Sequence, residues 1–130
     1  MKETDLQIIT GVYDKPYNCK GRKKIDGDIT TYEWKEAREP METPSTYKLT
    51  LIGSEGKVTL QRIGHIKSML TFVAGQRTKG VVETGFGQME LNIETLYINC
   101  PNVLSRSLEI SYKLDENSDM STNTFIIKEI

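Results

Sequence analysis

The chain has few of the residues that build metal centres and catalytic triads. Its 130 residues include one histidine, His65, and two cysteines, Cys19 and Cys100, which lie far apart. A single histidine excludes a multi-histidine metal site and leaves one candidate base for a triad, with no partner nucleophile in the sequence. Two isolated cysteines are typical of reduced thiols in a cytoplasmic protein, because small secreted domains carry more of them in pairs. We expect free cysteines, no metal, no cofactor and a cytoplasmic location.

Long apolar runs and an excess of one charge are also absent. No apolar stretch approaches the ~20 residues of a membrane helix, and the polar start Met1–Asp5 is not followed by a signal-peptide core. The 17 basic and 18 acidic residues nearly cancel, so the net charge of -1 gives no general attraction to nucleic acid or anionic membranes. We therefore expect neither partner, and the length predicts one domain over residues 1–130.

Apolar and polar residues alternate along most of the chain. From Tyr47 to Ile130 the alternation is interrupted at close intervals by short turns rich in Gly, Asn or Asp. This period of two predicts antiparallel strands with one buried face each, and Leu6–Thr10 and Asp28–Arg38 show the same pattern. A single layer of such strands must curl or pack on itself. The sequence therefore predicts an all-β, single antiparallel up-and-down barrel of about eight to ten strands.

The segment from Tyr13 to Gly27 is the least regular part of the chain. It contains Pro16, two glycines and the basic run Lys20–Lys24, and we predict a long surface loop. Cations beside tyrosines are also found where single-stranded nucleic acid binds. Because acidic residues elsewhere balance these charges, a solvated loop is the better interpretation.

Two short motifs imitate ion or phosphate sites without meeting their requirements. Asp115–Asp119 resembles the start of a calcium loop, but Met120 and Ile126 occupy the positions that need Gly and Glu. Gly85–Gly87 precedes a predicted strand, whereas a phosphate loop needs a helix N-terminus there. Both segments are predicted to be hairpin turns.

Several segments together resemble the YwiB-like proteins, small uncharacterised bacterial proteins that contain a domain of unknown function. The resemblance rests on Tyr32–Glu36, Val58–Gly64, Met69–Gly75, Thr84–Thr95, Leu108–Tyr112 and Ser121–Asn123, and covers most of the chain from Asp28 onward. It implies a closed calycin-type, lipocalin-like barrel. It implies no activity, because none is assigned to the family.

Polar residues that share a phase with the inner face are the candidate site. Arg62 is in phase with Val58 and Leu60, and a buried guanidinium costs several kcal/mol unless it is paired. Either an internal carboxylate such as Glu36 or an acidic group of a bound ligand would pair with it. The candidate ligand-binding residues of the barrel interior are Arg62, Tyr32, Trp34, Thr84, Thr95, Tyr97 and Tyr112.

Three functions are compatible with this pattern. The first is a binding module that takes a small, partly apolar and acidic ligand into the barrel mouth. The second is a structural or protein-interaction barrel with a filled interior, whose partner uses an outer sheet face or the segment from Tyr13 to Gly27. The third is an enzyme, for which the sequence shows no pair of residues whose spacing demands catalysis.

Overall fold

A computed structural model describes residues 1–11, 15–38, 43–101, 106–114 and 122–130. Within these residues the chain forms ten strands and one short 3₁₀ helix. The elements are β1 (Lys2–Thr10), β2 (Tyr17–Asp26), β3 (Ile29–Glu36), β4 (Ser45–Ile52), η1 (Gly53–Glu55), β5 (Lys57–Ile63), β6 (Lys67–Val73), β7 (Arg77–Thr84), β8 (Gly87–Asn99), β9 (Ser107–Leu114) and β10 (Thr122–Glu129). The turn predicted at Asp115–Asp119 lies outside the described residues.

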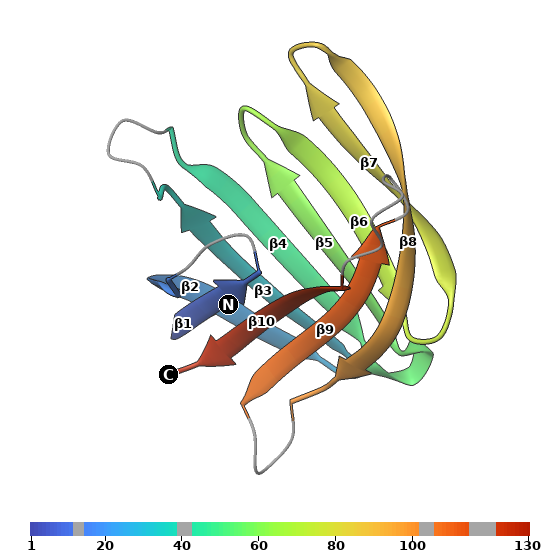
Figure 1. Ribbon diagram of the computed structural model, residues 1–130. Coiled ribbons are helices and arrows are strands. Elements are labelled where there is room, and N and C mark those ends of the chain that lie inside the picture. Colours follow the sequence, from blue (N-terminus) through green and yellow to red (C-terminus); the bar gives the residue numbers. More distant parts are fainter. Residues whose placement is uncertain (12–14, 39–42, 102–105, 115–121) are drawn as a thin grey trace.

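The strands form a closed antiparallel barrel (Figure 1). Each strand pairs with its neighbours in sequence, and β1 also pairs with β10, where Leu6 lies opposite Glu129 and Ile8 opposite Ile127. Among the described residues the closed order leaves no strand at the edge of the sheet, since each strand has a neighbour on both sides. The predicted all-β, up-and-down barrel is confirmed, with a strand number inside the predicted range.

The largest departure from the predicted fold is β2. The sequence predicts a surface loop from Tyr13 to Gly27, but Tyr17–Asp26 is a strand between β1 and β3, so the prediction is wrong there. Lys20, Arg22 and Lys24 are exposed, whereas Gly21 between them is buried. The basic run therefore lies mainly on the outer face of a barrel strand, and β2 supplies the pairing that β1 and β3 need.

The inner faces of the strands meet in one hydrophobic core. Tyr32 and Phe72 are its largest fully buried side chains, and each apolar side chain of this kind contributes about 1.5–3 kcal/mol when it leaves water. The core comprises Leu6, Ile8, Tyr32, Trp34, Leu49, Leu51, Val58, Leu60, Phe72, Ile93, Leu108, Ile110, Phe125 and Ile127. Between its two mouths the barrel is thus packed by side chains.

The two mouths differ in the elements that surround them. The proximal mouth lies around Lys23 and Glu129, where β1 and β3 begin, β2 and β10 end, and the two ends of the chain lie side by side (Figure 1). The distal mouth lies around Glu36 and Arg62, where β3 and β5 end and β4 and β6 begin. Each mouth carries its own group of polar side chains.

Candidate ligand-binding site

An open cavity of about 920 Å³ lies at the proximal mouth. Tyr32 and Leu51, both buried in the core, form part of its wall, and Ile25 adds an apolar side chain that is 65% exposed. The charged residues that line it are Lys2, Glu3, Asp5, Lys23, Arg106 and Glu129. Small-molecule sites are concave, mostly apolar spaces of roughly 300–1,000 Å³ with a few placed polar groups. This cavity has that size, and charged side chains make up a larger share of its lining.

An ion pair joins two strands inside the proximal mouth. Lys23 on β2 donates to Glu129 on β10 with Nζ and Oε1 2.8 Å apart, and only 21% and 14% of these side chains are exposed. Burial lowers the pKa of Lys23, but the hydrogen bond to Glu129 and the Glu129 charge outweigh it, so the pKa is raised. Lys23 therefore stays protonated and its charge is matched by Glu129.

Tyr32 lies directly beside this ion pair. The Lys23 ammonium is 5.5 Å from the centroid of the Tyr32 ring, within the range of a cation–π contact. Burial, and then the nearby Glu129 carboxylate, raise the pKa of the Tyr32 hydroxyl. Tyr32 is therefore neutral at physiological pH and presents the cavity with an apolar ring and a hydroxyl group.

Of the three cations that line this cavity, Arg106 and Lys2 form no ion pair among the described residues, and Arg106 is the one with a guanidinium. It lies just before β9, is exposed, and its backbone carbonyl accepts a hydrogen bond from the Glu129 amide. Within the described part of the chain its guanidinium forms no ion pair or hydrogen bond. It is thus available to an acidic group that enters the proximal mouth.

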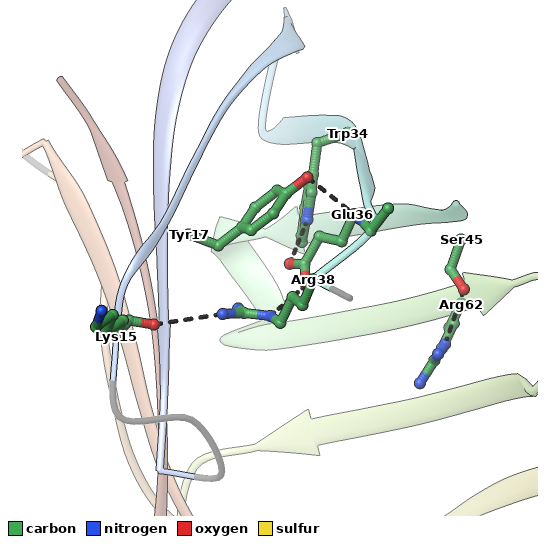
Figure 2. A network of polar contacts seen from close by, with 8 residues as sticks. Lys15, Tyr17, Trp34, Glu36, Arg38, Ser45 and Arg62 are labelled. Atoms are coloured by element: carbon green, nitrogen blue, oxygen red, sulfur yellow. Dashed lines mark hydrogen bonds and ion pairs between the residues drawn. The ribbon is translucent and has the colours of Figure 1, made fainter. Parts of the chain in front are cut away.

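At the distal mouth a buried carboxylate organises a polar network (Figure 2). Glu36, 8% exposed, accepts a hydrogen bond from Trp34 Nε1 at 2.9 Å and one from Arg38 Nε at 3.1 Å. The Arg38 guanidinium also lies over the Tyr17 ring and donates to the backbone carbonyl of Lys15. The network ties the end of β3 to the chain that enters β2.

Arg62 faces inward at the distal mouth, as its phase predicts. The β4–β5 and β5–β6 pairings contain no register shift, and Arg62 Nε donates to the oxygen of the buried Ser45 side chain at 3.3 Å (Figure 2). Glu36 is engaged by Trp34 and Arg38 and forms no ion pair with Arg62 among the described residues. Glu36, the internal partner that the sequence suggests for Arg62, is therefore not its partner in the structure, where Ser45 accepts the hydrogen bond.

Two predicted interior residues lie elsewhere. A register shift in the β8–β9 pairing between Thr95 and Tyr97 turns Tyr97 outward, where it is 42% exposed and donates to Glu109 at 2.7 Å. Thr84 ends β7, and its hydroxyl accepts a hydrogen bond from the Phe86 amide in the β7–β8 turn. The prediction that Tyr97 and Thr84 line the interior is wrong. A bulge in β8 turns the Tyr97 side chain outward, and the β7–β8 turn engages the Thr84 hydroxyl.

The remaining predicted residues lie inside but do not form one site. Tyr32 belongs to the proximal cavity, whereas Trp34 stacks on Tyr47 at the distal mouth, with ring centroids 5.4 Å apart. Tyr112 packs against Phe72, and burial raises the pKa of its hydroxyl. Thr95 is fully buried on β8, opposite Tyr112.

The sequence-based prediction missed the charged residues of the proximal mouth. Glu129 is in phase with Phe125 and Ile127, which is the signal that could have identified it as inward-facing. Lys23 was missed because its segment was predicted to be a loop. No local pattern marks Arg106, which lies outside the strands.

Neither a metal centre nor a membrane helix is found in the described ranges. No group of three or more His, Cys, Asp or Glu side chains there lies close enough together to hold a metal ion. No helix there has the length and apolar character to cross a bilayer.

The two cysteines are free and differ in exposure. Burial, and then the Glu36 carboxylate, raise the pKa of Cys19 from 9.0 to about 11, with Arg38 partly opposing this. Thiolate is the form that reacts with iodoacetamide, so at pH 8 we expect exposed Cys100 to be modified first. Cys19 should react about 100-fold more slowly than an ordinary thiol, because its raised pKa lowers its thiolate fraction. The Cys19 rate should rise about tenfold per pH unit up to about pH 10.

Peptide mass spectrometry over time measures both thiol rates. In a Cys100→Ser variant only the slow reaction should remain. Equal rates at the two positions in the unmodified protein would show that Cys19 is not shielded.

Comparison with known proteins agrees with the fold. The profile of a family described as "Domain of unknown function (DUF1934)" matches residues 13–127. The chain is therefore a single-sheet β-barrel protein with two polar mouths, and it belongs to the DUF1934 family. The crystal structure of the YwiB protein from Bacillus subtilis superposes with a TM-score of 0.66 at 19% identity, covering 100% of this chain and 94% of that one. No curated protein matches the chain.

Proposed function

We propose that the protein is a binding module that holds a small, partly apolar, acidic ligand in the cavity at the proximal mouth. The observation that carries this proposal is the cavity itself, about 920 Å³ in volume, beside a guanidinium without a counter-charge at Arg106. Polar atoms at defined places around an apolar wall are what orient a small ligand in such a site.

The two parts of the cavity suit the two parts of such a ligand. The ring of Tyr32 and the side chains of Leu51 and Ile25 offer contacts to an apolar body. Arg106 offers paired N–H donors to a carboxylate or phosphate, the geometry in which arginine binds most strongly. Lys23 is matched by Glu129, so it contributes hydrogen bonding and no net attraction.

A structural or protein-interaction barrel is the second candidate. The closely packed middle of the barrel favours it, because a barrel filled by side chains needs no ligand for stability. Its partner would contact an outer face, such as β2 with Lys20, Arg22 and Lys24. Native mass spectrometry of protein purified gently from its own host separates the two candidates, since only the binding module retains a small molecule.

The two free thiols support the expected cytoplasmic location.

Decanoate, an acidic and apolar molecule, tests the proposed site. We expect decanoate to shift the amide signals of Ile25, Tyr32 and Leu51 in a ¹H–¹⁵N spectrum. Arg106→Gln should weaken binding about tenfold, because one charge-assisted hydrogen-bond pair is lost. Ile25→Asp should weaken it at least as much, since it places a like charge in the cavity at an exposed position.

The matched control for Ile25→Asp is Phe86→Asp. Phe86 is fully exposed in the β7–β8 turn at the other end of the barrel, so the same change in charge should leave decanoate binding unaltered. Decanoate shifts that avoid the proximal mouth, or equal affinity in Arg106→Gln and the unmodified protein, would refute the proposed site.

A further inference from the structure

The tip of the β7–β8 hairpin, at the distal end of the barrel (Figure 1), carries a fully exposed phenylalanine. Phe86 has a relative exposure of 104%, although phenylalanine is among the residues most often buried in folded proteins. Its amide donates a hydrogen bond to Thr84 Oγ1 at 3.1 Å, and Thr84 Oγ1 donates to the Gly87 carbonyl at 3.4 Å. The turn therefore fixes the backbone of Phe86 and presents its ring to solvent, where an apolar contact would stabilise it.

An apolar hollow lies beside this hairpin, on the outer face of β5, β6 and β7. Ile63, Met69 and Val81 line it, and Ile63 and Met69 are 49% and 41% exposed. The hollow has a volume of about 180 Å³. Because an apolar space of about 150 Å³ can hold a benzene molecule, this hollow has room for one phenyl ring. Phe86 of the same chain does not enter it, since its ring is fully exposed.

Charged side chains at the rim favour a second copy of the chain as the source of the ring. Lys67 and Glu83 line the hollow and stand opposite each other in the β6–β7 register. Within the described residues neither of them takes part in an ion pair. Glu83 lies three residues before Phe86, so the ring of a second copy arrives together with a carboxylate. A contact with two-fold symmetry places Lys67 of each protomer against Glu83 of its partner, so opposite charges meet twice.

We propose that two copies of the protein form a symmetric dimer in which Phe86 of each protomer fills the hollow of its partner. The apolar side chains of the hollow then contact the ring, and the pairs of Lys67 and Glu83 lie at the rim. The contact is small compared with the roughly 1,200–2,000 Å² of a stable interface, so we expect a transient dimer with a dissociation constant of about 0.1 mM. The dimer uses the distal end of the barrel and leaves the cavity at the proximal mouth accessible.

Sedimentation velocity at protein concentrations from about 10 μM to about 1 mM measures this dimer. We expect the sedimentation coefficient to rise with concentration, and the amide signals of Met69, Val81 and Gly85 to shift in parallel in ¹H–¹⁵N spectra. Phe86→Ala should raise the dissociation constant at least tenfold, because both buried rings are lost. The control is Ile29→Ala, which removes a 41% exposed apolar side chain at the start of β3, at the proximal end, and should leave the dissociation constant unchanged.

Two charge variants test the symmetric pairing. Lys67→Glu and Glu83→Lys should each raise the dissociation constant about three- to tenfold, because each brings like charges together at the rim. An equimolar mixture of the two variants should associate at least as well as the unmodified protein, since opposite charges meet again at both rims of the mixed dimer. A pair within one chain cannot produce this recovery, because each variant alone carries two rim charges of one sign.

Sedimentation that does not change up to about 1 mM, as expected if a different protein uses the hollow, would overturn the proposal. Equal association of Phe86→Ala and the unmodified protein would overturn it too, and so would a mixture of the charge variants that associates no better than either alone. Phe86→Asp should likewise dissociate the dimer while decanoate binding persists, because the two sites lie at opposite ends of the barrel. These results are independent of the proximal cavity, whose test uses Arg106 and Ile25.

Discussion

Glu36→Leu is expected to lower the free energy of unfolding by about 3–5 kcal/mol. The substitution removes the acceptor of the Trp34 indole N–H and leaves the Arg38 charge without its buried carboxylate. Losing one member of a buried ion pair costs this much because the remaining charge is desolvated and unmatched. Urea unfolding at pH 7 measures the loss, and Trp34, the only tryptophan, reports on the network by its fluorescence.

Two further variants distinguish the loss of the buried carboxylate from the general effect of replacing a glutamate. Glu36→Gln keeps an oxygen acceptor for Trp34 and should cost clearly less than Glu36→Leu. Glu90→Leu alters a glutamate whose side chain is 70% exposed, and its effect should stay within about 0.5 kcal/mol. A loss below 1 kcal/mol for Glu36→Leu would mean that the network does not stabilise the distal mouth.

Gly21→Ala should destabilise the barrel by about 3 kcal/mol, a large effect for one methyl group. A Cβ atom at Gly21 would lie 2.5 Å from Leu6 Cδ1 and 2.6 Å from the backbone oxygen of Glu33. The leucine tip has room only by disturbing the core, and the Glu33 carbonyl belongs to the neighbouring strand and yields little. The shift of the urea midpoint at unchanged slope measures this cost.

Gly85→Ala is the matched control, because it reduces the conformational entropy of the unfolded chain as much as Gly21→Ala does. Nothing lies within 4 Å of a Cβ atom at Gly85, in the β7–β8 turn. We expect this variant to be as stable as the unmodified protein, or up to ~1 kcal/mol more stable, because alanine restricts the unfolded chain. Similar stabilities for the two alanine variants would contradict the close approach of β1 and β3 over Gly21.

The same contacts explain why β2 was not predicted. Its inner-face positions include Cys19, Gly21, Lys23 and Ile25, a row with too few apolar residues to show alternation. Gly21 is small because Leu6 and Trp34 occupy the space beside it, and Lys23 is tolerated because Glu129 matches its charge. Both reasons lie on other strands, so no window of local sequence contains them.

The candidate site was predictable only in part, because some of its residues depend on contacts with other strands. Arg62 faces inward because β5 is regular from Lys57 to Ile63, and phase alone is then sufficient. Tyr97 has an equally good phase, but the shift after Thr95 reverses it, and that shift arises from pairing with β9. The grouping of the polar residues into two mouths depends on the closed sheet, which brings Lys23 and Glu129 together from opposite parts of the chain.

Alternation of apolar and polar residues predicted the all-β architecture and the inward direction of Arg62, since both follow from the period of two along one strand. The short turns between the strands predicted their antiparallel order. The tertiary structure decided which charges are matched. Glu36 pairs with Arg38 and Glu129 pairs with Lys23. Arg106 and Arg62 have no carboxylate partner among the described residues. The physical reason is that ion pairs form between side chains a few ångströms apart in space, whatever their separation in sequence.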